Sequence, residues 1–200
     1  AFTCLHPDDE QWAQACLPTG NGGLGLRSLA QHSHAAYLAS RSQCLELCQR
    51  IDPAHTFESG SGLGPIPERT AIASYNANVN ADDLLGAELG GLSQKSLSKA
   101  VDKRCAQRLR SGACQARRAH LDLVSADGAG AFLNAVPSKT VGLSNEPSLF
   151  VGMLKRQLRT RFHEGDLECP FCDGVLDGFG DHALVCCGGG DRTRRHNLLR

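Results

Sequence analysis

Four residues of the kind that bind metal ions follow one another with the spacing C-x2-C-x9-H-x3-C near the end of this 200-residue chain. They are Cys169, Cys172, His182 and Cys186. Two cysteines separated by two residues form a turn that lets both sulfurs face one ion, and the histidine and third cysteine complete a tetrahedral set. A site with four protein ligands leaves no position for water. The spacing therefore predicts a small module with a structural Zn²⁺ site rather than a catalytic one.

The sequence leaves two alternatives to this ligand set open. On a helical His182–Cys187 segment, Cys186 shares the face of His182 at i+4, whereas Cys187 at i+5 is rotated away. We therefore predict Cys186 as the fourth ligand, with Cys187 as the alternative. Two disulfides are the other alternative, although cysteines crowded beside a histidine favour a metal. Asp181 precedes the histidine, and we expect its carboxylate to orient the imidazole ring.

Charge is balanced over the whole chain but not along it. Lys plus Arg and Asp plus Glu number 21 each, which excludes a histone-like composition. The first 100 residues hold 6 basic and 10 acidic side chains, a net of −4, and the last 100 hold 15 and 11, a net of +4. The C-terminal half is thus the candidate for binding an anionic partner. Within it we predict a nucleic-acid-binding basic tail that consists of Arg192, Arg194, Arg195 and His196.

Apolar residues recur at helical spacing in most of the chain, so the predicted fold class is mainly α. The predicted helices begin at Ser28, near Pro67, at Gln94, near Ala116 and at Ser144–Pro147. Ser28 with Gln31 has the spacing of a capping box. Ser93 is the predicted N-cap of the helix from Gln94 to about Arg110, in which an apolar stripe consists of Leu97, Val101, Cys105 and Leu109. Outside the region of the four predicted ligands, the sequence shows no convincing strand. We expect the other cysteines to be buried as small apolar residues: Cys4, Cys16, Cys44, Cys48, Cys105 and Cys114.

The composition divides the chain into four predicted segments. Residues 1–52 form a helical segment, 53–80 a flexible linker with a short helix, 81–163 a helical domain, and 164–200 the zinc module with the start of a basic helix. The chain starts at Ala1 rather than Met and stops inside an expected helix, so we interpret it as part of a longer protein. No run approaches the roughly 20 apolar residues that span a bilayer, and no secretory signal is evident. We therefore expect an intracellular location, nuclear or cytoplasmic.

Two catalytic readings are weak on sequence grounds. Asp82 and Asp83 resemble the paired aspartates that hold Mg²⁺ in polymerases, but no strand-like run flanks them. Cys114 with His120 would be a cysteine-hydrolase pair, yet it rests on two residues six apart on one helix. We set both readings aside.

Several blocks resemble one family. The segment Gly180-Asp181-His182-Ala183-Leu184-Val185-Cys186, followed by Gly189-Gly190-Asp191-Arg192-Thr193-Arg194-Arg195-His196-Asn197, is similar to the C-terminal region of non-LTR retrotransposon polyproteins. These polyproteins carry a reverse transcriptase, a CCHC zinc knuckle and a restriction-enzyme-like endonuclease. Residues 17–40 resemble the family's segment after the polymerase palm, and residues 130–138 resemble its linker.

The resemblance implies a thumb-like helical segment and linker followed by the zinc knuckle. The family's palm aspartates would precede Ala1 and its nuclease constellation would follow Arg200, so we expect this chain to be no enzyme by itself. It would bind template RNA, target DNA or both, beside the rest of the parent polyprotein. The alternative is a zinc-stabilised protein–protein interaction domain that binds no nucleic acid.

Overall fold

The computed structural model describes residues 5–55, 66–86, 91–142, 144–190, 193–194 and 197, with only the backbone at 66–68 and 190. The chain forms two compact units. Unit 1 consists of residues 1–12 and 131–200, and unit 2 of residues 13–130. Helix α1 (Asp9–Ala15) contributes residues to both.

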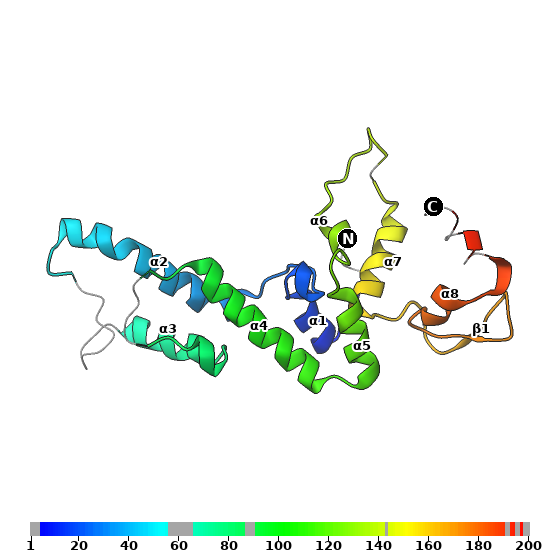
Figure 1. Ribbon diagram of the computed structural model, residues 1–200, viewed down its shortest axis with the longest axis horizontal. Coiled ribbons are helices and arrows are strands. Elements are labelled where there is room, and N and C mark those ends of the chain that lie inside the picture. The colour runs from blue at the N-terminus through cyan, green and yellow to red at the C-terminus, as the bar shows by residue number, and fades with distance from the viewer. Residues whose placement is uncertain are drawn as a thin grey trace. The chain divides into compact units, whose positions relative to one another are not determined.

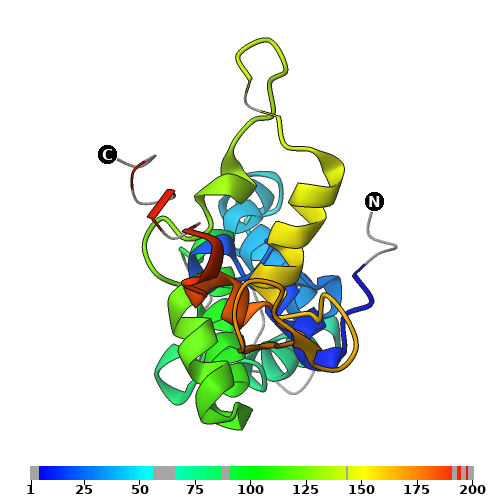
Figure 2. The same cartoon turned by 90° about the vertical axis from the view of Figure 1, so that its right-hand side faces the viewer.

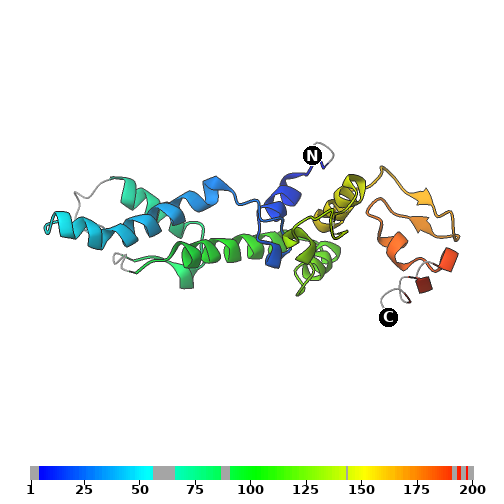
Figure 3. The same cartoon turned by 90° about the horizontal axis from the view of Figure 1, so that it is seen from above.

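Unit 2 is helical. Its α-helices are α2 (Leu29–Ile51), α3 (Ile66–Asn76), α4 (Gln94–Gly112) and α5 (Gln115–Val124), with short 3-10 turns at Thr19–Asn21 and Ala81–Asp83. Helix α2 packs against both α3 and α4, and α2 and α4 lie side by side in Figures 1 and 3. The predicted linker at 53–80 thus falls within unit 2, although its residues 56–65 lie outside the described part of the chain.

Helix α4 follows the sequence prediction closely. The side chain of Ser93 accepts a 3.1 Å hydrogen bond from the backbone N–H of Ser96, which confirms Ser93 as the N-cap. In the predicted apolar stripe, Leu97 and Val101 are buried and Cys105 is partly buried. The stripe therefore faces the core of unit 2.

Helix α2 begins where the sequence predicted, but the hydrogen bonds at its first turn differ from the predicted ones. Ser28 is the N-cap residue, yet its side chain makes no capping hydrogen bond, so the predicted capping box is wrong. The backbone carbonyl of Ser28 instead accepts from the N–H groups of Gln31 and His32, at 3.2 and 3.1 Å. Tertiary packing of the helix, rather than a local cap, accounts for its length of 23 residues.

Small residues let the helices of unit 2 approach closely. Its buried core consists of Ala35, Leu38, Ala39, Ala71, Tyr75, Val79, Leu97, Ala100 and Val101. Four of these nine are alanines, which bring helix backbones near one another where larger side chains would hold them apart. Burial, followed by the negative charge of Asp83, raises the pKa of Tyr75 to about 12.

Two polar groups are buried in unit 2 with their partners. Asp102 is 5% exposed, and its carboxylate contacts Arg27 Nη2 and His32 Nε2, both at 3.2 Å. Gln14 is fully buried: its Nε2 donates to the carbonyl of Gly22 at 2.8 Å, and its Oε1 accepts from Arg117 at 2.6 Å. These bonds satisfy groups that would otherwise cost free energy to bury.

Unit 1 is smaller and less regular. It contains α6 (Ala131–Asn134), α7 (Pro147–Leu158), the antiparallel strands β1 (Leu167–Glu168) and β2 (Val175–Leu176), and α8 (Asp181–Val185), with a 3-10 turn at Gly188–Gly190. Figure 2 shows the two-stranded ribbon and α8. We call residues 167–186 the metal module.

The described part of the chain is mainly helical, as the sequence predicted. Within that part, no helix has the length and apolar character needed to cross a membrane. Burial of the scattered cysteines was predicted too broadly: Cys16 is buried, but Cys44 and Cys114 are exposed. Cys4 lies outside the described residues.

Candidate metal centre

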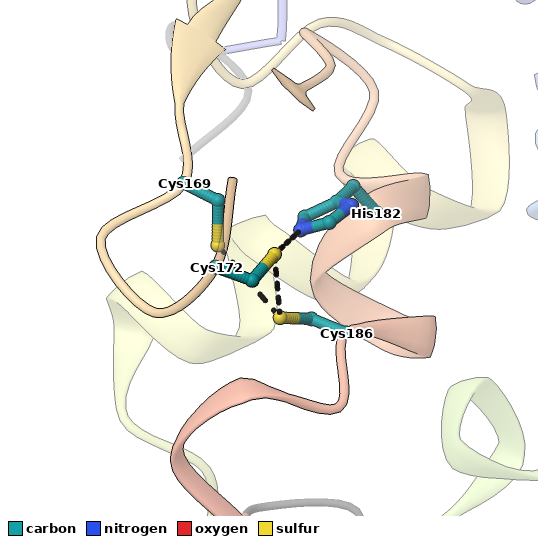
Figure 4. Close-up of side chains that lie close together, drawn as sticks. All are labelled: Cys169, Cys172, His182 and Cys186. Atoms are coloured by element: carbon teal, nitrogen blue, oxygen red, sulfur yellow. Dashed lines mark hydrogen bonds between the residues drawn. The ribbon is translucent and has the colours of Figure 1, made fainter. Parts of the chain in front are cut away.

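The four residues of the predicted ligand set come together from three successive elements of the metal module. Cys169 follows β1 directly, and Cys172 lies in the turn that leads to β2. His182 is in the first turn of α8, and Cys186 is the residue that caps its C-terminus. Figure 4 shows the side chains pointing toward a common centre. We call these four residues the metal cluster.

The ligand atoms are close enough to hold one metal ion. All of them lie within 4.8 Å of one another. Cys172 Sγ is 3.3 Å from His182 Nε2 and 3.6 Å from Cys186 Sγ, which in turn is 3.7 Å from Cys169 Sγ. The histidine therefore presents Nε2 to the sulfurs (Figure 4).

These separations can be compared with those around a tetrahedral ion. For Zn–S bonds of about 2.3 Å and a Zn–N bond of about 2.0–2.1 Å, tetrahedral angles place two sulfurs about 3.8 Å apart and a sulfur about 3.6 Å from the nitrogen. The three separations between cluster atoms given above lie within a few tenths of an ångström of these values. Three sulfurs and one imidazole nitrogen at such distances are compatible with zinc.

Disulfides do not explain the cluster. A disulfide bond is about 2.05 Å long, whereas Cys186 Sγ is 3.6 Å from Cys172 Sγ and 3.7 Å from Cys169 Sγ, and none of the nine described cysteines forms a disulfide. Cys187 is not among the four residues whose ligand atoms lie within 4.8 Å of one another. Its exposed thiol donates to the backbone carbonyl of Val185 at 3.6 Å.

A glycine lets the first two cysteines approach the histidine. The N–H of Gly174 donates to Cys172 Sγ at 3.4 Å, and its carbonyl accepts from the N–H of Cys169 at 3.0 Å. A Cβ at this position would lie 2.6 Å from Cε1 of His182, closer than carbon atoms can pack. Position 174 therefore needs glycine, which the cysteine spacing alone did not indicate.

Asp177 sets the start of the helix that carries the histidine. Its Oδ1 accepts from the N–H groups of Phe179 and Asp181 at 2.9 and 3.1 Å, and its Oδ2 accepts from that of His182 at 2.7 Å. Burial alone would raise the pKa of Asp177, but these N–H bonds outweigh it and hold the pKa below its usual value. The carboxylate thus fixes the backbone at His182.

Asp181 has a different role from the one expected. Its carboxylate pairs with Arg156 and, at 3.1 Å, with Arg159 at the end of α7. Partial burial acts against ionisation, but the hydrogen bond from Arg156 and the charge of Arg159 outweigh it and lower the pKa of Asp181. The aspartate therefore connects α8 to α7 rather than serving the imidazole ring.

The thiols of the cluster differ in acidity. The backbone N–H of Phe171 is the largest influence on Cys169 and, with hydrogen bonds from the other cluster residues, lowers its pKa to about 6 against the effect of burial. At Cys186 the N–H of Gly188 lowers the pKa, but burial and the sulfurs of Cys172 and Cys169 outweigh it and raise the pKa. The thiolate is the form of cysteine that binds a metal ion, and the lowered pKa of Cys169 favours that form.

The basic tail is only partly described. Arg194 is exposed, as a phosphate contact requires, whereas Arg192, Arg195 and His196 lie outside the described residues. Other arginines of the basic half have structural partners. Arg108 donates to the carbonyl of Ala77 at 3.1 Å, and Arg159 and Arg161 stack on the ring of Phe179, with their guanidinium carbons 4.6 and 5.0 Å from its centroid.

The structure does not support the two catalytic interpretations that the sequence made weak, the paired aspartates and the cysteine-hydrolase pair. Asp82 and Asp83 lie in a 3-10 turn, and Asp83 pairs with Lys103 at 3.3 Å. The only strands in the described part of the chain are β1 and β2 of the metal module. Cys114 is exposed at the start of α5, whereas His120 is buried at 4% exposure.

The fold and the cluster define a mainly helical chain with a Cys3His candidate metal centre. No protein-family model, curated protein or solved structure matches it.

The cap at Asp177 gives a testable prediction. Asp177→Ala removes three acceptor contacts from the backbone that presents His182, so we expect metal affinity to fall about 10-fold or more, as it does when groups that orient a ligand are removed. Competition with a chromophoric chelator measures the affinity. Asp173→Ala is the matched control, because Asp173 is an exposed carboxylate of the same module. Equal affinities of the two variants would show that Asp177 does not support the site.

Proposed function

We propose that this chain is a nucleic-acid-binding fragment of a retrotransposon reverse transcriptase polyprotein and that its metal cluster holds a structural Zn²⁺ ion. The single observation that carries the proposal is the geometry of the cluster, directly followed along the chain by the basic tail. Three sulfurs and Nε2 lie within 4.8 Å of one another, so they would supply all four ligands of a tetrahedral ion. The family resemblance of the segments around the cluster supports the same proposal.

The zinc would act on structure rather than on chemistry. A module of so few residues has little apolar core, and Phe171, Val175 and Val185 are 63%, 57% and 66% exposed. Binding free energy of the metal would therefore supply much of its folding free energy. The fragment would perform no polymerase or nuclease reaction by itself.

The nucleic-acid contact would come from the basic tail. Arginine presents a planar fork of donors that suits phosphate oxygens and stays charged at any physiological pH. Three arginines within four residues form a strong local positive field even in a chain whose formal charge is zero. Contacts to the phosphate backbone would make binding sensitive to salt and largely insensitive to sequence, for RNA and DNA alike.

Replacing Arg192, Arg194 and Arg195 by Ala tests this contact. Each arginine that binds a phosphate releases counterions, so we expect the Kd of the triple variant for a fluorescent duplex to rise about 10-fold or more. The salt slope, which is the steepness with which the logarithm of the binding constant falls with the logarithm of the salt concentration, should decrease by about 2 to 3. Anisotropy titrations at two salt concentrations measure both quantities, and zinc content should stay unchanged. If the triple variant binds as tightly as the parent at both concentrations, the basic tail is not the contact.

One observation favours a second candidate function, a zinc-stabilised domain that binds another protein. The metal module exposes the apolar side chains Phe171, Val175 and Val185, and exposed apolar groups are typical of protein interfaces. The two functions differ in their response to salt. Nucleic-acid binding weakens steeply as salt rises, whereas apolar association does not.

A further inference from the structure

A groove in unit 2 gathers positive charge from several segments. Its volume is about 670 Å³. One wall is the turn that contains Pro18, Gly20 and Asn21, and the other is one face of α4. Its cationic side chains are Arg27, Lys95, Lys99, Lys103 and Arg110. We call this feature the α4 groove.

The only carboxylate that lines the α4 groove is already neutralised. Asp102 is 7% exposed in its side chain and contacts Arg27 and His32. Of the cations, Lys103 pairs with Asp83 at 3.3 Å, and Arg110 pairs with Asp122 at 2.9 Å.

Lys95 and Lys99 are left without a counter-charge. Both are exposed, and neither forms an ion pair with any carboxylate in the described part of the chain. The α4 groove therefore favours an anionic ligand over a neutral or cationic one.

The spacing of the cations suits a repeating anion. Lys95, Lys99 and Lys103 are four residues apart, so the backbone positions that carry successive lysine side chains are about 6 Å apart along one face of α4. From Lys95 to Arg110 the row extends about 22 Å, much longer than a single phosphate group. One strand of a duplex carries a phosphate about every 3.4 Å of axis. A nucleic-acid strand that runs parallel to α4 would thus place about two phosphates beside each lysine.

We propose that the α4 groove binds the phosphate backbone of a nucleic acid. This inference rests on the proposed nucleic-acid-binding function and adds to it a second contact, made by residues of unit 2 and independent of the zinc. It also separates the basic residues of this region into two groups. Arg104 and Arg108 donate to Asn80 and to the Ala77 carbonyl, whereas Lys95 and Lys99 are available to a ligand.

The experiment compares Lys95→Gln/Lys99→Gln with the parent chain in anisotropy titrations of a fluorescent duplex. We expect the Kd of the double variant to rise about 10-fold at low salt and the salt slope to fall by about 2, because two side chains that release counterions have been replaced. Both side chains are exposed, so the far-UV circular dichroism spectrum should not change. The matched control is Arg118→Gln/Lys139→Gln, which removes the same charge from two exposed positions outside the α4 groove.

Four outcomes would overturn the inference. Unchanged binding by the double variant would do so, as would a loss of affinity no larger than that of the control. If only the tail variant is weakened, the proposed function stands without the α4 groove. If the parent protein binds polyglutamate, but not the duplex, and the double variant loses that binding, the occupant is an acidic protein segment instead.

Discussion

Cys186→Ser should abolish metal binding, whereas Cys187→Ser should leave it intact. Cys186 Sγ lies 3.6 and 3.7 Å from the sulfurs of Cys172 and Cys169, so its removal leaves three ligands and an open position. A serine hydroxyl is a poor substitute, because a thiolate is a soft, charged ligand and the hydroxyl is neither. Metal content should fall from about one equivalent to near zero, and the metal module should lose its order because metal binding and folding are coupled.

The control for this prediction is the adjacent cysteine. Cys187 has the same chemistry one residue later, but it is not one of the four residues whose ligand atoms lie within 4.8 Å of one another, and its exposed thiol donates to the Val185 carbonyl. Zinc release by a thiol-reactive reagent, followed with a colorimetric chelator, compares the two variants. If Cys187→Ser loses the metal and Cys186→Ser keeps it, the fourth ligand is Cys187 and the arrangement in Figure 4 is wrong.

Gly23→Ala should lower the stability of unit 2 more than any conservative substitution on its surface does. A Cβ at position 23 would lie 2.0 Å from the carbonyl oxygen of Leu17 and 2.6 Å from that of Gln14. Both contacts are with backbone, which cannot swing aside. We expect the free energy of unfolding to fall by about 3 kcal/mol or more, the range of severe overpacking.

The backbone around Gly23 explains why relaxation would be costly. The N–H of Gly25 donates to the Leu17 carbonyl at 2.8 Å, and that of Leu24 donates to Ala15 at 3.1 Å. Moving the segment away would break these bonds. Gly20→Ala is the matched control, because a Cβ there meets nothing within 4 Å and should change stability by less than about 1 kcal/mol. Urea unfolding followed by circular dichroism compares the variants, and similar midpoints would contradict the predicted clash.

The helical part of the fold was largely readable from periodicity. Leu97 and Val101 with the cap at Ser93 predicted α4, and Pro147 marks the first residue of α7 as expected. Short elements were not readable, because β1 and β2 are two residues each and no periodicity can develop over that length. The predicted cap at Ser28 failed because side-chain capping depends on a rotamer, which residue spacing does not determine.

The spacing of the cysteines and the histidine predicted the four residues that lie close together, but not the groups that support them. Asp177 caps α8 from five residues before His182, and Gly174 leaves room for the imidazole ring. The N-cap rule could not have indicated this contact, because Asp177 lies four residues before the first residue of α8 and Gly180 occupies the N-cap position. The partner of Asp181 could not be read, because Arg156 lies 25 residues away along the chain.

The sequence could not predict which basic side chains are buried with partners and which are available to a ligand. Composition could not separate Arg117, which is 8% exposed and bonds to Gln14, from Lys99, which faces the α4 groove. Arg117 lies in the half of the chain with net positive charge and Lys99 in the half with net negative charge, so composition favoured the buried residue, and only the tertiary partners distinguish the two. The chain's formal charge of zero therefore hides the local field of the α4 groove.

Elemental analysis of the freshly reduced parent chain tests the zinc assignment most directly. We predict about one zinc ion per chain, held by Cys169, Cys172, His182 and Cys186, with the metal module losing order when a strong chelator removes it. Less than about half an equivalent of metal in reduced protein that has been supplied with zinc, or a module that stays ordered in the chelator, would contradict the assignment.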